Sequence, residues 1–389
     1  MQDAASPFTF NTVQSIVFGE GAIADIGEIA ARRGWKRVLL VTDPGLVKLG
    51  MIAQPVAALE EAGVSVAVYS DVEADPPEHV VKAAAQAAGA HAADAVIGLG
   101  GGSSLDVAKL AALLALGKED MPAIYGVGNA RGPRLPLMLI PTTAGTGSEV
   151  TPIAIVTTGT SEKMGVVSPV LLPDIALLDP QLTWGLPPAV TAATGIDAMV
   201  HAIEAHASAS TNNNPVSRAL AREALRLMGG AIERAVRAGG DRSARADMLL
   251  GSMLAGQAFA NSPVAAVHAL AYPIGGHFHV PHGLSNALVL SHVLRFNAET
   301  AGHLYADIAP IVFPHLVELG SQAQGAAFAD ELAELSQRCG LQPRLRDMGI
   351  PESALDLLAD DAMKQTRLLV NNPRPLTRSD ALAIYRAAW

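Results

Sequence analysis

The chain has 389 residues, of which 50% are hydrophobic, so it is long enough for two or three domains with sizeable cores. Its 27 Lys and Arg residues against 37 Asp and Glu residues give a net charge of −10, which argues against binding to nucleic acids or anionic membranes. The single cysteine, Cys339, excludes an internal disulfide framework and favours a cytoplasmic protein. The N-terminus lacks the pattern of a secretion signal, and no uncharged apolar run has the length of a membrane span.

The first half of the chain alternates short β-branched runs with amphipathic helices, which is typical of a parallel α/β sheet. The predicted strands are 15–18, 37–42, 64–69, 95–97, 137–140 and 175–178, and the predicted helices between them are 23–33, 51–62 and 78–88. From about Pro187 onward the hydrophobic period becomes helical. The predicted helices there are 189–209, 216–237, 243–260, 264–274, 283–296, 303–316, 324–338, 352–366 and 378–388. We therefore expect an α/β domain at 1–184 and an all-helical domain at 185–389.

A glycine-rich loop follows the predicted strand 95–97 and opens a helix. Its residues 98–109 read GLGGGSSLDVAK. Consecutive glycines let a phosphate approach the backbone, and the helix N-terminus behind them presents free N–H groups, so a pyrophosphate fits here. The loop departs from the usual dinucleotide-binding fingerprint, because Ser103 stands at its last glycine position. A tight turn that binds nothing is the alternative.

Two further loops end strands of the same sheet. Asp43 closes the second strand at the sheet edge where ligands bind in open α/β folds, and its carboxylate would accept from ribose hydroxyls and repel a 2′-phosphate. It favours NAD over NADP, unless it only initiates the Asp-Pro-Gly turn. Residues 141–149, PTTAGTGSE, bring hydroxyl groups and glycines to another strand end, where they fit a phosphate or ribose or form a plain polar loop.

Four of the eleven histidines lie within residues 268–283, HALAYPIGGHFHVPHG. Imidazole is a common transition-metal ligand, so we looked for partners elsewhere. Asp197 and His201 are i and i+4 in a predicted helix, which stacks both on one face. With His268 and His282 they form a donor set suited to Fe(II) or Zn(II). Spacing alone does not choose among His277, His279 and His282, and each histidine taken singly could be an ordinary core or surface residue.

Four motifs in this order resemble the iron-containing (group III) alcohol dehydrogenases: GGGSSLDVAK (100–109), PTTAGTGSEVT (141–151), GIDAMVHAIEAH (195–206) and HALAYPIGGHFHVPHGLSNALVL (268–290). The resemblance implies a dinucleotide-binding α/β domain and an all-helical domain, with metal and nicotinamide meeting in the cleft between them. It implies metal binding by Asp197, His201, His268 and His282, which selects His282 over His277 and His279. It implies NAD contacts by Asp43, Gly100, Gly101, Gly102, Ser103, Thr142, Thr143, Thr146, Lys163 and Leu182, to which we add Asp106 of the same motif.

The chain departs from the resembling family at two places. Many members carry a second histidine four residues after the ligand that corresponds to His268, and Tyr272 stands there instead. Asp75-Pro76 stands where many members have Asn-Pro. We expect His268 to act at the metal and His277 or Tyr272 to relay protons, although an ordinary tyrosine is a poor base at neutral pH. Phe259 either lines an apolar pocket or only packs between helices.

The predicted function is a metal-dependent transfer of hydride between a small alcohol, or its aldehyde or ketone, and NAD(H), with Fe2+ or Zn2+ as the metal. The rivals on the same scaffold are a maleylacetate reductase, a hydroxyacid-oxoacid transhydrogenase, a glycerol dehydrogenase and a dehydroquinate synthase, and a metal- and nucleotide-binding regulator is the rival that is not an enzyme. We also expect a cytoplasmic homodimer or higher homo-oligomer that binds neither nucleic acid nor membrane.

Overall fold

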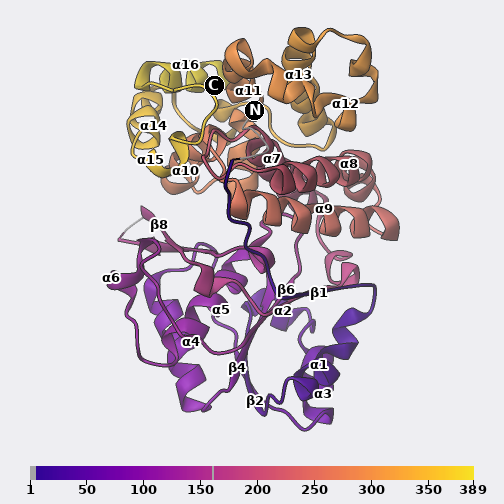
Figure 1. The fold of residues 1–389 in the computed structure, drawn as a ribbon, viewed down its shortest axis with the longest axis vertical. Coiled ribbons are helices and arrows are strands. Elements are labelled where there is room, and N and C mark those ends of the chain that lie inside the picture. Colours follow the sequence, from indigo (N-terminus) through magenta and orange to yellow (C-terminus); the bar gives the residue numbers. More distant parts are fainter. Residues whose placement is uncertain (1–5, 160–161) are drawn as a thin grey trace. The chain divides into compact units, whose positions relative to one another are not determined.

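The computed structural model describes residues 6–159 and 162–389. The chain divides into two compact units, which are treated separately below (Figure 1). The α/β unit comprises residues 11–143 and 147–184, and the helical unit comprises residues 6–10, 144–146 and 185–389. Among the described residues, no helix combines the length and apolar character needed to span a membrane.

The α/β unit is built on a six-stranded sheet with the order β1-β9-β6-β4-β2-β3, and every pairing recorded in it is parallel. Its strands are β1 (Ser15–Phe18), β2 (Arg37–Val41), β3 (Ser65–Tyr69), β4 (Ala95–Gly100), β6 (Leu137–Pro141) and β9 (Ile175–Leu178). The central strands β4 and β6 are buried along their whole length, as expected for parallel strands covered on both faces. This agrees with the prediction of a parallel sheet.

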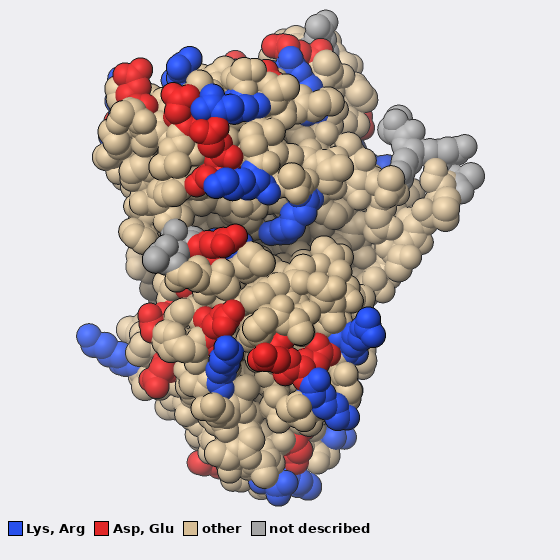
Figure 2. Space-filling model, turned by 90° about the vertical axis from the view of Figure 1, so that its left-hand side faces the viewer, with Lys and Arg blue, Asp and Glu red and all other residues tan. Residues whose placement is uncertain are grey.

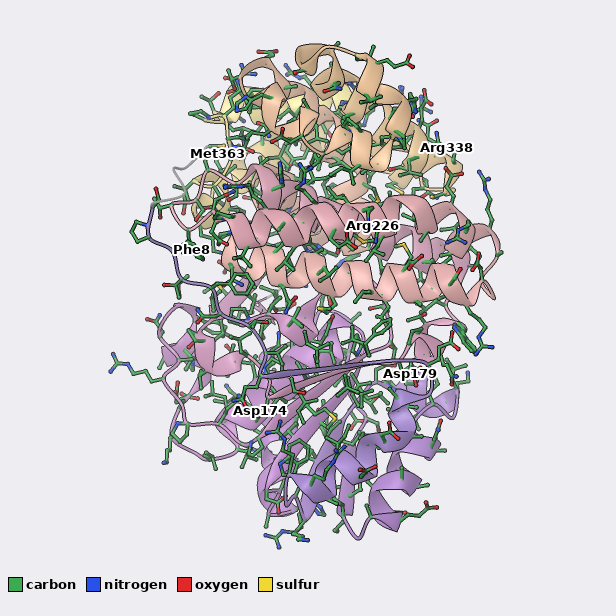
Figure 3. All side chains as sticks on the ribbon, turned by 45° about the vertical axis from the view of Figure 1, so that its right-hand side comes forward. Phe8, Asp174, Asp179, Arg226, Arg338 and Met363 are labelled. Atoms are coloured by element: carbon green, nitrogen blue, oxygen red, sulfur yellow. The ribbon has the colours of Figure 1, made fainter. Side chains whose placement is uncertain are left out.

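Helices cover both faces of this sheet (Figure 1). Alternate residues along the strands pack into two apolar clusters, one with α1 (Ile26–Arg32) and α3 (Ala53–Glu61), the other with α4 (Glu78–Ala90) and α5 (Gly102–Leu114). The short helices α2 (Pro44–Lys48) and α6 (Met121–Ile124) complete the described α-helices of this unit. Asp174 and Asp179 flank β9: Asp174 accepts from Leu137 N, and Asp179 accepts from Gly21 N and Ile23 N (Figure 3).

A second, small sheet was absent from the sequence prediction. It consists of β5 (Gly126–Val127), β8 (Glu162–Val167) and β7 (Ile153–Thr158), with β7 and β8 antiparallel. The residues of β7, IAIVTT, have high β-propensity, but the alternation of strands and helices that guided the prediction has no place for a hairpin here.

The helical unit contains α7 (Pro188–Ala207), α8 (Pro215–Arg237), α9 (Arg242–Asn261), α10 (Ala266–Phe278), α11 (His282–Ala306), α12 (Ala309–Val312), α13 (Ser321–Arg338), α14 (Leu355–Ala362), α15 (Thr366–Leu369) and α16 (Arg378–Ala388). Helix α7 is buried over most of its length and packs against α8, α9 and α11. Three predictions of helix bounds were wrong. Helix α11 continues to Ala306, and the predicted helix 303–316 is broken into the end of α11, α12 and a 3-10 helix at Pro314–Glu318. The predicted helix 352–366 is reduced to a 3-10 turn at Glu352–Ala354 and α14. Figure 2 shows basic and acidic side chains interspersed on one face, in keeping with an overall acidic chain.

Candidate metal centre and dinucleotide-binding loops

One face of α7 presents three buried ionisable side chains, those of Asp197, His201 and Glu204. Their spacing of i, i+4 and i+7 places them on successive turns of the same face. The Nδ1 of His201 donates to the carbonyl of Gly145 (3.2 Å), which leaves its Nε2 with a lone pair. The His201 ring is stacked on Phe259, with centroids 4.4 Å apart, so its orientation is fixed by packing.

His268, on α10, completes a group of potential donors. Its Nδ1 donates to Oε2 of Glu204 (2.6 Å), and Oε1 of Glu204 accepts from the backbone N–H of Val267 (2.7 Å). The Nε2 of His268 is buried, has no hydrogen-bond partner among the described residues, and lies 3.8 Å from Oδ1 of Asp197. One ligand atom each from Asp197, His201 and His268 lies within 4.8 Å of the others. A carboxylate that orients a metal-binding imidazole through its other nitrogen is a common arrangement around metals.

His282 lies at the edge of this group. It is the first residue of α11, its Nε2 is 3.7 Å from Oδ1 of Asp197, and its side chain is 43% exposed. The next residue, Gly283, allows this approach, because a Cβ there would lie 2.3 Å from the carbonyl oxygen of Ala193 on α7. Asn286, one turn along α11, donates to Asp197 Oδ1 (2.5 Å) and lies 3.3 Å from His282 Nε2.

The electrostatics of this cluster keep the His201 imidazole available as a ligand. Burial lowers the pKa of His201 to about 3, and the neighbouring histidines add to the shift against the opposing effect of Asp197. Burial would raise the pKa of Asp197, but His282, His201, His268 and the Asn286 hydrogen bond together lower it. At neutral pH the group therefore offers a carboxylate and a neutral imidazole. We call Asp197, His201, His268 and His282 the metal cluster; with its unpartnered His268 Nε2, this N3O donor set fits Fe(II) or Zn(II).

The candidate proton relays have different surroundings. The Tyr272 ring lies 5.8 Å from the His282 ring, and its hydroxyl lies 3.5 Å from Nη2 of Arg367. His277 instead pairs with Asp361, at 2.6 Å between Nε2 and Oδ2. His279 ends α10 with a φ of +54°. Of the three, only Tyr272 has a recorded contact with a member of the metal cluster in the described residues.

In the α/β unit, the ends of three adjacent strands, β2, β4 and β6, carry the predicted dinucleotide-binding loops. Gly100 ends β4 with a φ of +154°, and a Cβ there would lie 2.6 Å from the Ser104 side chain, so only glycine fits. Gly101 is the N-cap of α5, and the N–H of Thr142 donates to the carbonyl of Gly100 (3.0 Å). The backbone N–H groups of the first turn of α5 are thus available to a pyrophosphate.

The Asp43 carboxylate caps a helix and also lies beside the glycine loop. Its Oδ1 accepts from Leu46 N (3.1 Å) and caps α2, whereas its Oδ2 lies 3.5 Å from the position that a Cβ on Gly100 would occupy. The carboxylate therefore initiates the turn and also stands at the glycine loop.

The other predicted cofactor residues lie on different elements and have different contacts. Lys163, on β8, pairs with Asp75 Oδ1 (2.6 Å) and donates to Thr157 (3.0 Å). Thr143 is half-buried next to Gly101, and Leu182 packs on the apolar cluster of α1 and α3. Thr146 belongs to the helical unit. Gly102 and Ser103 occupy the first turn of α5.

Asp106 takes part in a buried network that the sequence reasoning missed. Its carboxylate accepts from Ser148 Oγ (2.6 Å) and Ile155 N (2.9 Å). The fully buried ammonium of Lys109 donates to Ser148 Oγ (2.7 Å), Thr151 Oγ1 (3.1 Å) and Ile153 O (2.6 Å). We call Asp106, Lys109, Ser148 and Thr151 the lysine cluster; it ties α5 to residues 148–155. The cofactor role of Asp106 stays a prediction, since both of its carboxylate oxygens have internal partners.

Glu204 and Asn286 were also missed, although their spacing contains a signal. Glu204 lies seven residues after Asp197 on the same helical face, and Asn286 lies four residues after His282. Polar residues that repeat on the face of a proposed ligand are candidates for groups that orient it.

Comparison with known proteins bears on the whole chain. A family model described as iron-containing alcohol dehydrogenase matches residues 14–180, and its C-terminal counterpart matches residues 191–389. Long-chain-alcohol dehydrogenase 1 of Geobacillus thermodenitrificans is 44% identical over 95% of this chain and 94% of its own length. A crystal structure of 1,3-propanediol oxidoreductase has a TM-score of 0.95 at 35% identity and covers 98% of this chain and 100% of its own.

A third similar protein was solved with a dinucleotide. It is sulfoacetaldehyde reductase from Bifidobacterium kashiwanohense in complex with NAD+, with a TM-score of 0.88, 29% identity and 98% of each chain covered. Both units thus match one family over nearly all of the chain. The chain belongs to the iron-containing alcohol dehydrogenase family and is a metal-dependent oxidoreductase of alcohols and aldehydes.

Proposed function

We propose that this protein transfers a hydride between a small alcohol or its carbonyl product and NAD(H), using a divalent Fe or Zn ion held by the metal cluster. The observation that carries the metal assignment is the buried Nε2 of His268, which has no partner among the described residues and stands 3.8 Å from the Asp197 carboxylate. A buried polar atom without a partner is costly, and a cation shared with Asp197 and His201 would remove that cost.

Asp197, His201, His268 and His282 would hold the ion. When bound, the divalent ion supplies Lewis acidity toward the substrate oxygen, and NAD supplies the hydride acceptor. The chain's own residues orient the ligands. Glu204 holds the His268 ring with its Nε2 toward Asp197, and the Gly145 carbonyl and the Phe259 ring hold His201.

The glycine loop and its neighbours would hold the dinucleotide. Gly100, Gly101, Gly102 and Ser103 would bind the pyrophosphate at the N-terminus of α5, and Asp43 would accept from the ribose hydroxyls. Thr142, Thr143, Thr146, Lys163 and Leu182 would contact the rest of the cofactor. The carboxylate of Asp43 supports NAD over NADP, because a 2′-phosphate would meet a like charge there. The NAD+ complex of the similar sulfoacetaldehyde reductase supports the same choice.

For proton transfer, Tyr272 is a better candidate than His277. Its ring contacts His282, whereas the His277 imidazole pairs with Asp361. We propose that protons leave the site through water near Tyr272, with His268 acting only as a ligand.

The test is turnover after metal reconstitution. The protein is stripped of metal, reloaded with Fe(II) or Zn(II), and assayed with alcohols, diols and 2-hydroxy acids with NAD and with NADP. We expect net NADH formation that requires metal and prefers NAD. A lyase of the dehydroquinate synthase type would return its NAD unchanged, so absence of net NADH with every substrate and metal would refute the proposal.

We also propose a domain boundary at residues 184/185, with the dinucleotide bound by residues 1–184 and the metal by residues 185–389. A division between Trp184 and Gly185 supports this boundary, whereas residues 6–10 and 144–146 group with the helical unit. The enzyme is proposed to be a homodimer or higher homo-oligomer in the cytoplasm, and light scattering on the purified protein measures its mass.

A further inference from the structure

Tyr272 contacts both the metal cluster and a part of the helical unit that the proposed function does not use. It lies four residues after His268 on α10, so the two side chains project from the same face of that helix. Its ring centroid is 5.8 Å from that of His282, with the planes tilted by 43°. A ligand that extends from His282 along this ring would contact the other neighbours of Tyr272.

Arg367 is a second neighbour of the Tyr272 ring. It belongs to α15, which packs against α10, and its side chain is exposed. Its guanidinium carbon lies 6.0 Å from the centroid of the Tyr272 ring, and its Nη2 lies 3.5 Å from the Tyr272 hydroxyl. The guanidinium thus sits on the tyrosine that contacts a proposed metal ligand.

The charge of Arg367 is not neutralised within the protein. In the described part of the chain it forms no ion pair, whereas nearby cations are paired: Lys364 with Asp361 (2.6 Å), Arg374 with Glu299 (2.8 Å) and Arg378 with Asp356 (2.9 Å). Asp361 also pairs with His277. The Arg367 guanidinium therefore keeps donors for an outside anion, and its planar fork matches a carboxylate.

We propose that Arg367 binds the carboxylate of a substrate whose hydroxyl group is at the opposite end of the molecule. The substrate class is straight-chain ω-hydroxy acids and the corresponding aldehyde acids, so this inference rests on the proposed function and names its substrate. The Tyr272 ring lies 5.8 Å from the His282 ring and 6.0 Å from the guanidinium carbon, so an extended chain of about six to ten carbons, at about 1.2 Å per bond, fits within these two steps.

The reaction changes only the alcohol end of such a substrate. The alcohol carbon loses a hydride to NAD+, the hydroxyl proton leaves to water, and the C–O single bond becomes a double bond. The products are the aldehyde acid, NADH and a proton. The carboxylate and Arg367 are unchanged, so Arg367 acts on substrate choice and not on the chemical step.

The kinetic test compares 6-hydroxyhexanoate with 1-hexanol, which has the same chain and no carboxylate. In Arg367→Met, the ratio of kcat/KM for the acid to kcat/KM for the alcohol should fall about ten- to hundredfold, mainly through the KM of the acid, because a charge-assisted hydrogen bond is lost. Arg367→Lys should recover part of the ratio. Arg386→Met removes another exposed arginine with no recorded ion pair, on α16, and should leave the ratio unchanged.

A second readout does not depend on turnover. Phenylglyoxal labels exposed arginines, and peptide mass spectrometry measures the labelling of Arg367 in zinc-loaded protein. We expect 6-hydroxyhexanoate to slow this labelling, 1-hexanol to leave it unchanged, and labelling of Arg386 to be insensitive to both. Equal use of both substrates, with an unchanged ratio in Arg367→Met, would overturn the proposal, and so would labelling that the acid does not slow. If the wild-type protein oxidises no alcohol at all, the proposed function fails, and the labelling result still decides the role of Arg367.

Discussion

The α/β unit and the helical unit each bury a group of ionisable side chains, and the two groups use their hydrogen-bonding capacity differently. In the lysine cluster, the ammonium of Lys109 has three donors and three oxygen partners, at 2.6 to 3.1 Å. In the metal cluster, Asp197, His201 and His268 gather their ligand atoms within 4.8 Å, yet the buried Nε2 of His268 has no partner among the described residues. The ammonium of the first group has all of its donors matched, whereas the second group leaves a buried imidazole nitrogen without a partner in the described structure.

An unpartnered atom is not diagnostic by itself. His206 is also buried on α7, and neither of its ring nitrogens has a hydrogen-bond partner in the described structure. Its nearest recorded carboxylate is the half-exposed Asp307, at 3.8 Å, and burial lowers the pKa of His206 to about 4. What separates His268 from His206 is convergence: a carboxylate and a second imidazole aim at the same small volume, and Glu204 holds the ring in place. A ligand site therefore needs both features.

The largest effect should follow from removing the unpartnered atom. In His268→Ala, the proposed metal site loses one of its four ligands, so metal content should drop and turnover should fall by about a thousandfold or more, since the ion contributes several kcal/mol. Elemental analysis and steady-state assays measure both. His315→Ala, which removes an exposed histidine paired with Glu331, is the control and should change neither. Retention of metal and turnover by His268→Ala would remove the distinction between the clusters.

Removing the cation of the lysine cluster should lower the stability of the protein and leave its metal content unchanged. Lys109→Met leaves the largely buried Asp106 carboxylate without its cation, which should lower the free energy of unfolding by about 3 kcal/mol. Urea denaturation measures this loss, and the metal content of the folded protein should stay at the wild-type level. Lys82→Met breaks an exposed pair with Glu78 and should cost less than about 1 kcal/mol. An equal loss of unfolding free energy in both variants would mean that the buried Lys109 contributes no more to stability than an exposed lysine.

Much of this comparison was open to prediction from local patterns. The spacing of Asp197 and His201 predicted one helical face, and the structure brings both next to His268. The succession of strands, turns and helices predicted the parallel sheet. These features follow from the geometry of single elements, which repeats at fixed periods and so is visible in the chain itself.

The parts that escaped prediction depend on contacts between distant segments. His277 pairs with Asp361, which is 84 residues away, so the choice among His277, His279 and His282 had no local signal. Lys109 donates to Ser148 and Ile153, which lie about forty residues further along the chain. The sequence therefore contained no local signal that Lys109 of the glycine-loop motif holds α5 to that segment. The antiparallel pair β7–β8 was missed because a regular alternation of strands and helices contains no antiparallel pair.

A smaller effect on metal binding is expected from Glu204, which orients the proposed ligand His268. Glu204→Gln keeps the size of the side chain but weakens its hydrogen bond to His268, so metal affinity should fall about ten- to hundredfold. Competition with a chromophoric chelator measures the affinity. Glu223→Gln, on the exposed surface of α8, is the matched control and should leave it unchanged. If Glu204→Gln bound metal as tightly as the wild type, the carboxylate would be only a structural partner of α10.

A pH dependence is expected from Glu149, which is next to Ser148 of the lysine cluster in the chain. Burial raises the pKa of Glu149 from its ordinary 4.5 to about 7, against the opposing effects of its own backbone hydrogen bond and of Lys109. Between these values the folded protein holds a proton that the unfolded chain has lost, so stability falls as pH rises from 4.5 to 7. Glu149→Gln cannot lose that proton. The unfolding free energy of the wild type should therefore decrease relative to Glu149→Gln by about 3 kcal/mol across this window, as measured by urea denaturation at each pH.

Lys109 provides a way to sharpen this pH test, because its positive charge opposes the rise in the pKa of Glu149. Without that charge, in Lys109→Met, the pKa of Glu149 should rise further and the loss of stability should extend to higher pH. The same titration in His268→Ala should match the wild type, because the metal cluster contains no group that acts on Glu149. A shift of the window in His268→Ala would show that the two clusters are not independent. An unchanged window in Lys109→Met would show that Lys109 does not act on Glu149.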